Sequence, residues 1–298
     1  MNIHHLETFV RIIEAKSFTR AAEELSLTQP TVSKQIVDLE QFFQVRLIDR
    51  TKRSLALTRA GEILFNYAKD FVALKREAID AMAAFRGLKS GSLRLGASSI
   101  PGVYILPPIL KAFKSRFSGV ELTLVLSDSK DITTRVENGD IDVGFVGSRE
   151  ETKRIAYRKF LEDNIIFVAP LDFAEAIDIH DIADYPLLTR EPGSGTRKCF
   201  ETALRKRHLK LEDLHVVGEL GDTEAIKAAV REGMGISYIS NRAVREELER
   251  GLLKVLPVKG LPGVKRSFYV ITKKDRSISP QAEALFRIIS EWRHNGHE

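Results

Sequence analysis

The chain has 298 residues, of which 46 are basic and 41 acidic, giving a formal net charge of +5 and a pI near 9.2. A chain of this length holds about two domains, and the small basic excess permits a polyanionic partner without identifying one. The single cysteine, Cys199, excludes an intramolecular disulfide framework. No apolar run approaches the roughly 20 residues of a membrane span, and no secretory signal pattern opens the chain. We therefore expect a cytoplasmic protein without a membrane partner.

The first element is a helix predicted over residues 3–15, whose apolar residues recur at helical spacing and should be buried. These residues are Leu6, Phe9, Val10 and Ile13. His4 and His5 lie near its start, but adjacent helical side chains point in different directions, and no Cys or His accompanies them at ligand spacing. We expect no metal there and no cofactor in the protein.

Residues 18–42 predict two short helices joined by a tight polar turn. Thr28 is placed to cap the second helix, with Pro30 in its first turn. The side chains expected to face inward are Ala21, Ala22 and Leu25 in the first helix and Val32, Ile36, Leu39 and Phe43 in the second. The pattern is typical of a helix-turn-helix that reads the major groove. The alternative is an αα-hairpin inside any helical domain.

The outer surface of the second helix is polar, short-chained and poor in acid. Its hydroxyls and amides suit base edges and phosphates, so we expect double-stranded DNA as a partner. The candidate DNA-binding residues of this segment are Arg20, Thr28, Gln29, Pro30, Thr31, Ser33 and Lys34.

Residues 46–58 predict a short β-hairpin with a basic tip, a wing that lies along the sugar-phosphate backbone. Arg50, Lys52 and Arg53 at this tip would neutralise phosphates and make binding salt-dependent. A solvated loop is the alternative for the same three cations.

The segment from Phe9 to Gly61 resembles the N-terminal domain of the LysR-type transcriptional regulators. The residues that carry the resemblance are Phe9, Ser17, Phe18, Thr19, Ala21, Ala22, Leu25, Gln29, Pro30, Ser33, Ile36, Leu39, Glu40, Leu47, Arg50, Leu57, Thr58, Ala60 and Gly61. The resemblance implies a winged helix-turn-helix on promoter or operator DNA and no enzymatic activity. It also implies a homo-oligomer, a dimer of dimers, with RNA polymerase as a candidate further partner.

A long helix is predicted over residues 59–88, starting from Thr58 as its cap. Its apolar residues approximate a heptad stripe, and they are Ala60, Ile63, Leu64, Tyr67, Phe71, Leu74, Ala78, Met82 and Phe85. We expect an antiparallel partner helix from a second chain, as in the linker helix of the resembled family. Packing on its own domain is the alternative. Residues 87–91 should end the helix as a hinge.

From Ser92 onward, nearly continuous apolar runs alternate with helical stretches, which predicts an α/β fold with parallel sheet. This part resembles the two-lobed effector domain of the same family, similar to periplasmic binding proteins. The fold class expected for the whole chain is therefore α/β, with a winged helix-turn-helix, a long linker helix and a two-lobed effector domain. The expected boundaries are 1–58, 59–88 and 89–298, with lobe I at 92–162 and 265–298 and lobe II at 163–264.

Three strand ends carry loops suited to a ligand, at residues 96–102, 190–197 and 219–224. Free backbone N–H groups, hydroxyls and helix dipoles there favour a small anion, with Arg197 or Arg190 as its counter-charge. Asp222 argues against an anion at the third loop because its carboxylate would repel it. The candidate effector-binding residues are Ser98, Ser99, Ile100, Ser127, Gly147, Ser194, Gly195, Thr196, Arg197, Asp222 and Thr223. Ordinary capped turns are the alternative.

The segment REPGSGTR at residues 190–197 is similar to regulators of sulfur assimilation and carbon fixation. This similarity implies a sulfur oxyanion or a carboxylated or phosphorylated metabolite as effector. Cys199 beside Phe200 is expected to be a core residue, not a redox sensor. Two other functions remain open, a binding protein of transport type and an α/β enzyme, although no nucleophile elbow, P-loop or dinucleotide fingerprint is present.

Overall fold

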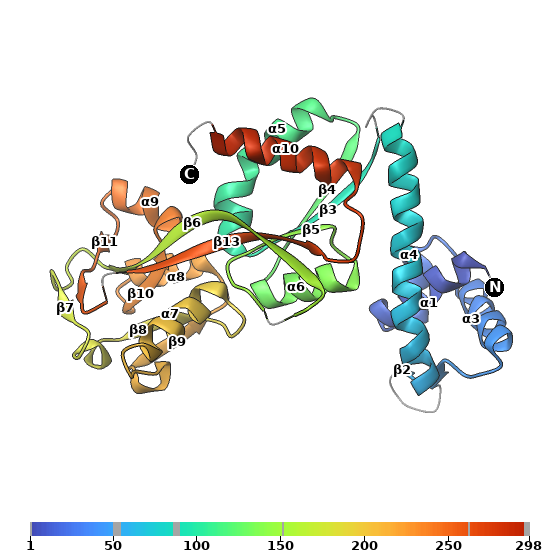
Figure 1. Cartoon of the computed structure of the whole chain (residues 1–298). Coiled ribbons are helices and arrows are strands. Elements are labelled where there is room, and N and C mark those ends of the chain that lie inside the picture. The colour runs from blue at the N-terminus through green and yellow to red at the C-terminus, as the bar shows by residue number, and fades with distance from the viewer. Residues whose placement is uncertain (1, 50–54, 86–89, 151, 262, 295–298) are drawn as a thin grey trace. The chain divides into compact units, whose positions relative to one another are not determined.

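The computed structural model describes residues 2–49, 55–85, 90–150, 152–261 and 263–294. They fall into two compact units, Met1–Met82 and Ala83–Glu298, which are described separately (Figure 1). Within the described residues, no helix is both long and apolar enough to cross a membrane.

The N-terminal unit has the predicted helix-turn-helix followed by a small hairpin and a long helix. Its elements are α1 (Ile3–Ala15), α2 (Phe18–Glu24), α3 (Gln29–Phe43), β1 (Ile48–Asp49), β2 (Ala56–Leu57) and α4 (Arg59–Phe85). Thr28 caps α3 as predicted, since its side chain accepts a hydrogen bond from the Thr31 N–H. The strands β1 and β2 pair antiparallel, but the tip of the hairpin at residues 50–54 lies outside the described residues.

The core of this unit consists of apolar side chains from the first three helices, with Leu6, Phe9, Val32, Ile36 and Leu39 all buried. Three details of the predicted core are wrong. Leu25 is only partly buried and does not belong to the core cluster of this unit. The fully buried residue near the end of α1 is Ile12, whereas Ile13 is only partly buried. Phe43 is 38% exposed, because α3 ends there and Gln44 turns the chain into a left-handed conformation.

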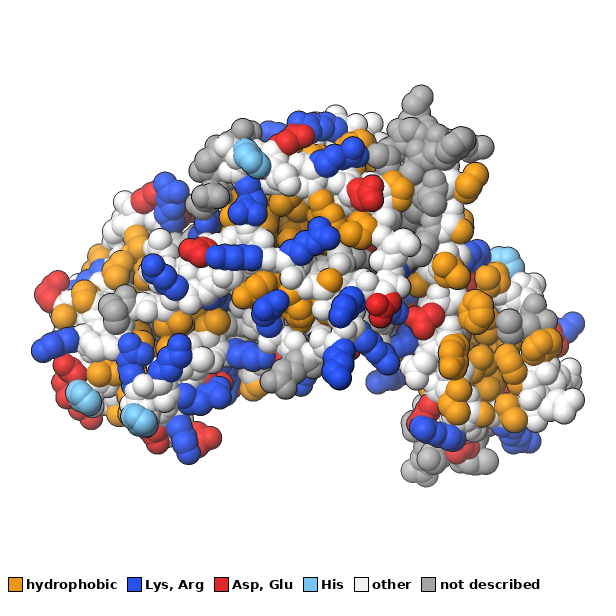
Figure 2. All heavy atoms as spheres, in the orientation of Figure 1, with side chains coloured by type: hydrophobic (Ala, Val, Ile, Leu, Met, Phe, Trp, Pro, Cys, Tyr) orange, Lys and Arg blue, Asp and Glu red, His pale blue; other side chains and the backbone are white. Residues whose placement is uncertain are grey.

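The long helix α4 has two apolar faces. One face packs on the core of the unit through Ala68, with Ala60, Leu64, Phe65 and Val72 partly buried. The other face is exposed, and it includes Ile63, Tyr67, Phe71, Leu74 and Met82. Figure 2 shows hydrophobic side chains gathered on the visible surface of this unit. The predicted apolar stripe therefore belongs only in part to the core.

The C-terminal unit is built on one nine-stranded sheet in the order β4-β3-β5-β13-β6-β10-β8-β9, with β11 added to β6. Its strands are β3 (Gly91–Ala97), β4 (Val120–Leu126), β5 (Val143–Val146), β6 (Ile155–Ala169), β8 (Leu187–Arg190), β9 (Val216–Leu220), β10 (Ile236–Ser240), β11 (Lys254–Val255) and β13 (Val264–Lys273). A separate pair joins β7 (Ile177–Asp178) to β12 (Val258–Lys259).

The sheet is parallel within each half but not throughout. The strand β3 pairs parallel with β4 and β5, and β8 pairs parallel with β9 and β10. The long strands β6 and β13 run antiparallel to each other across both halves (Figure 1). The sequence indicated only the second half of β6, because residues 155–163 contain a basic pair and an acidic pair instead of a continuous apolar run.

Helices cover both faces of the sheet. They are α5 (Leu106–Arg116), α6 (Ser129–Asn138), α7 (Gly195–Arg205), α8 (Thr223–Arg231), α9 (Asn241–Glu249) and α10 (Pro280–His294). A π-helical turn, Pro101–Ile105, precedes α5 and was not predicted. One large apolar cluster joins α5 and α10 to α8 and α9 across the sheet, while a second cluster lies under α7. The two parallel halves run in opposite directions, so the loops after β3 and β8 face each other between the halves.

Candidate functional site

The outer surface of α3 is preorganised by contacts among its own polar side chains. The Gln29 amide donates to the Ser33 hydroxyl at 2.9 Å, and the Thr28 and Thr31 hydroxyls are 2.8 Å apart. Lys34 is exposed, and so are Arg20, Thr28, Gln29, Pro30 and Thr31, whereas Ser33 is partly buried. The predicted DNA-binding residues of this segment are therefore accessible.

Glu40, near the end of α3, connects this helix to the hairpin. Its carboxylate accepts hydrogen bonds from the backbone N–H groups of Leu47, at 2.8 Å, and Ile48, at 3.3 Å. This contact fixes the hairpin against α3, which is the geometry of a wing. The predicted phosphate contacts Arg50, Lys52 and Arg53 lie outside the described residues.

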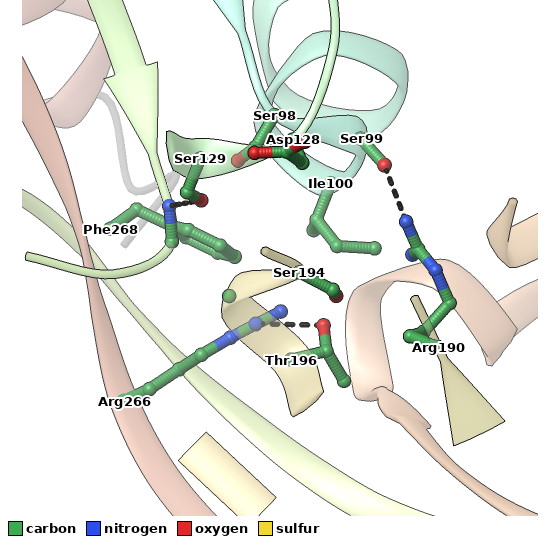
Figure 3. Close-up of a pocket in the computed structure, with 12 residues that line it drawn as sticks. Ser98, Ser99, Ile100, Asp128, Ser129, Arg190, Ser194, Thr196, Arg266 and Phe268 are labelled. Atoms are coloured by element: carbon green, nitrogen blue, oxygen red, sulfur yellow. Dashed lines mark hydrogen bonds between the residues drawn. The ribbon is translucent and has the colours of Figure 1, made fainter. Parts of the chain in front are cut away.

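The second site is a cleft in the C-terminal unit, between the loop after β3 and the N-terminus of α7 (Figure 3). Its inner part is a small chamber. The chamber is lined by Ser98, Ser99, Ile100, Asp128, Ser129, Gly147, Arg190, Ser194, Gly195, Thr196, Arg266 and Phe268. Seven predicted effector residues are thus brought together here: Ser98, Ser99, Ile100, Gly147, Ser194, Gly195 and Thr196.

The N-terminus of α7 faces this chamber. Ser194 is its capping residue, yet the Ser194 side chain makes no capping hydrogen bond. The first N–H groups of a helix have no partner within the helix, so the backbone and the free hydroxyl both remain for a ligand. A glycine is required at position 195, because a Cβ there would lie 2.9 Å from the carbonyl carbon of Gly147 on the opposite wall.

Arg266 on β13 was not predicted as a site residue, and it provides the positive charge of the chamber. Its side chain is only 3% exposed and forms an ion pair with Asp163 at 2.7 Å. Nη1 donates to the Thr196 hydroxyl at 2.9 Å, whereas Nη2 is buried and has no hydrogen-bond partner. A buried, unpaired guanidinium nitrogen is costly. Figure 3 shows this side chain reaching into the chamber beneath Ser194.

The two arginines that the sequence suggested are already engaged by protein groups. Arg190 binds both carboxylate oxygens of Glu191, at 2.7 and 2.9 Å, and reaches Thr223 at 2.6 Å and Ser99 at 3.2 Å. It therefore lines the chamber and also bridges its two walls.

Arg197 turns away from the inner chamber and is held by two carboxylates, Glu201 at 2.9 Å and Glu219 at 2.6 Å. These hydrogen bonds raise the pKa of the Arg197 guanidinium, although partial burial acts in the opposite direction. Arg266 therefore lines the inner chamber, whereas Arg197 does not.

An outer chamber of about 370 Å³ adjoins the inner one through Ser99, Asp128 and Arg190. Ser127 and Asp222 line this outer space. Asp222 caps α8, as its carboxylate accepts from the Ala225 N–H at 3.0 Å. Thr223 belongs to a third, small and more apolar chamber, which is lined by Arg190 together with Ile100, Thr196, Ile226, Tyr238, Ile239 and Ser240.

Further contacts join the two walls of the cleft. Lys198 on α7 forms an ion pair with Glu150 at 2.9 Å, and the Tyr104 hydroxyl donates to Glu224. Burial, followed by this hydrogen bond, raises the pKa of Tyr104. These contacts link the two walls in the arrangement that the structure shows.

Neither a reactive cysteine nor a metal site is supported by the described residues. Cys199 packs against the apolar cluster under α7, and burial raises the pKa of its thiol, which disfavours the reactive thiolate. Among the described residues, no group of His, Cys, Asp and Glu is arranged to hold a metal. The His4 ring instead contacts Glu7 at 2.8 Å.

Two family models match the chain. One, described as bacterial regulatory helix-turn-helix protein, lysR family, matches residues 3–62. The other, described as LysR substrate binding domain, matches residues 86–293. Most of α4, residues 63–85, lies between the two matched segments.

Known proteins give the same assignment over the whole length. The chain is 34% identical over 287 residues to the transcriptional activator CmpR of Synechocystis, covering 95% of this chain and 93% of CmpR. It is also 34% identical over 286 residues to the regulator CbbR of Rhodospirillum rubrum, covering 95% and 94%. The regulatory domain of Synechocystis CcmR, solved in complex with 2-PG, matches with a TM-score of 0.63 and 27% identity, covering 70% of this chain and 99% of that domain.

Proposed function

The chain belongs to the LysR family of DNA-binding transcriptional regulators, and from that premise we propose that a small anionic effector binds in the inner chamber and controls it. The expected resemblance and fold class are confirmed. An anion held by Arg266, Ser194, Gly195 and Thr196 would occupy the chamber. The effector class we propose is a carboxylate, a phosphate metabolite or a sulfur oxyanion.

One observation carries this proposal. The buried Nη2 of Arg266 has no partner, and the uncapped N-terminus of α7 faces the same chamber. Both groups are donors, so an acceptor with negative charge satisfies them together. The CcmR domain, which was solved with 2-PG, supports a small ligand in this kind of domain.

The cleft also supports a mechanism of control. Residues of the loop after β3 and residues of α7 form opposite walls, so an anion bridging them favours the closed arrangement. An effector shifts such an equilibrium only by its difference in affinity between the two arrangements. We propose that this difference changes the placement of paired reader domains on DNA.

We propose that the α3 surface contacts base edges, through Arg20, Thr28, Gln29, Pro30, Thr31, Ser33 and Lys34, and that Arg50, Lys52 and Arg53 contact phosphates. The exposed apolar face of α4 supports pairing with a second chain. A dimer of dimers is the assembly that we propose.

The remaining assignments follow from the same function. We propose domains at 1–58, 59–88 and 89–298, with lobe I at 92–162 and 265–298 and lobe II at 163–264. We also propose a cytoplasmic location, RNA polymerase as a further partner and no catalytic role. Family membership argues against the transport-type binding protein and the α/β enzyme.

The test is calorimetry on the full chain with acetate, sulfate, methyl phosphate and dimethyl phosphate. Arg266→Lys keeps a positive charge beside Asp163 but removes the unpaired nitrogen, so it should weaken any binding at least tenfold. Lys265→Arg, one residue away on the exposed side of β13, is the matched control. The proposal is wrong if none of the four anions binds at millimolar concentration, or if Arg266→Lys binds them as well as the unaltered protein.

A further inference from the structure

The charges around the cleft do not suit every anion. Two basic side chains, Arg190 and Arg266, and three acidic ones, Asp128, Glu191 and Asp222, line the inner and outer chambers. Both arginines already face a carboxylate, since Glu191 holds Arg190 and a buried aspartate behind the chamber holds Arg266. The lining therefore carries no excess of positive charge for a ligand with two negative charges.

Asp128 is the acidic residue whose side chain lines the inner chamber. It lines both chambers, and its carboxylate lies against the backbone of Gly193, where a Cβ would be 3.0 Å from the carboxylate carbon. Gly193 directly precedes Ser194, the capping residue of α7. The carboxylate thus stands at the helix N-terminus that we assign to the anion, but on the opposite wall (Figure 3).

Only part of the Asp128 carboxylate is used by the fold. Oδ1 caps α6 by accepting from the N–H groups of Lys130, at 2.8 Å, and Asp131, at 2.9 Å. Capping α6 requires an oxygen acceptor but no charge, and an asparagine caps about as well as an aspartate. The negative charge at position 128 therefore contributes something that capping does not require.

We propose that Asp128 makes this site select singly charged anions over doubly charged ones, and that the favoured effector carries a hydrogen-bond donor or a positive charge facing Asp128. This inference rests on the proposed function, because it assumes that the anion binds at α7. The Coulomb cost of a nearby carboxylate doubles when the ligand charge doubles. A phosphomonoester or sulfate is therefore disfavoured relative to a carboxylate, a phosphodiester or a zwitterion such as an amino acid.

The test uses two ligands that share one head group. Dimethyl phosphate has a single charge, whereas methyl phosphate is doubly charged at pH 8, well above the second phosphate pKa of about 6. Calorimetry on the full-length protein measures both affinities at fixed salt. We expect the unaltered protein to prefer dimethyl phosphate, and Asp128→Asn to raise the ratio of methyl phosphate to dimethyl phosphate affinity about tenfold.

The matched control is Asp131→Asn, which removes the same charge one turn along α6, where Asp131 pairs with Arg135 at 2.8 Å. We expect this variant to keep the ratio of methyl phosphate to dimethyl phosphate affinity within about twofold of the ratio of the unaltered protein. The thermal unfolding of Asp128→Asn is measured alongside, and a preserved melting temperature is expected because the cap remains.

Three results would overturn the inference. They are a preference of the unaltered protein for methyl phosphate, an unchanged ratio in Asp128→Asn, or an equal change in Asp131→Asn. If both phosphates still bind and Arg266→Lys weakens their binding, the proposed anion site is supported and only the proposed selectivity is wrong. If neither phosphate binds to the unaltered protein, the proposed anion site fails and the selectivity fails with it.

Discussion

Gly195→Ala should weaken effector binding even though it improves the local helix. Gly195 is the first residue of α7, and its backbone conformation is one that alanine adopts. Within a helix, alanine is favoured over glycine by roughly 0.5–1 kcal/mol. Any loss of affinity therefore comes from contact with the opposite wall of the cleft and not from the helix itself.

The energetic cost of that contact can be judged from three distances. The added Cβ would lie 2.9 Å from the Gly147 carbonyl carbon, 3.1 Å from the Gly147 oxygen and 3.0 Å from the Ser129 hydroxyl. Unstrained contacts are about 3.5–4.0 Å, so the walls must separate by roughly 0.5 Å. Overpacking of this kind costs about 1–3 kcal/mol, and a cost of about 1 kcal/mol in the bound form alone lowers anion affinity about fivefold.

The assay is calorimetry with whichever of the four anions binds best, together with thermal unfolding. Gly221→Ala is the control, because a Cβ at that position meets nothing within 4 Å. It should bind the anion within about twofold of the unaltered protein. If Gly195→Ala binds the anion as tightly as the unaltered protein and unfolds at a higher temperature, then the helix effect acts alone and the closed cleft is not the binding form.

Three further predictions test other parts of the protein. Lys34→Ala or Ser33→Ala should weaken operator binding while folding is preserved, and Lys34→Ala should lower the salt slope by about one; unchanged affinity of both at fixed salt contradicts the reader assignment. Thr196→Ala should reduce anion affinity about tenfold, because it removes the hydroxyl that holds the Arg266 side chain in place, whereas Thr202→Ala on the same helix should leave the affinity unchanged. Equal anion affinities of Thr196→Ala and the unaltered protein, measured by calorimetry, would refute this prediction. The raised pKa of Cys199 predicts slow alkylation at pH 7 that accelerates with rising pH, and rapid labelling at pH 7 would contradict its burial.

The reader domain could be predicted closely because its signals are local. Thr28 and Pro30 mark the start of α3 by capping chemistry, and the spacing of Val32, Ile36 and Leu39 fixes its buried face. The same spacing rule failed at Phe43, since periodicity says which face a residue shares but not whether another element covers that face.

The effector cleft could be predicted only in part. The sequence singled out the loops after β3 and β8, which are rich in glycine and serine, and Ser98, Ser194 and Thr196 of these loops do line one chamber. Arg197 and Arg266 show the limit of this reasoning. Both are single arginines in the sequence, and only their partners decide that one is neutralised by two glutamates while the other keeps an unpaired nitrogen in the chamber.

By itself, the sequence determined the helix-turn-helix, the long apolar helix and the alternation of strands and helices. Each of these depends on neighbours a few residues apart along the chain. The tertiary structure alone decided that Arg266 of β13, Asp128 of α6 and the N-terminus of α7 share one chamber, because 138 positions separate the first two and the crossing of β6 and β13 brings them together. The charge that a ligand meets is the sum over those distant residues, and no local pattern contains that sum.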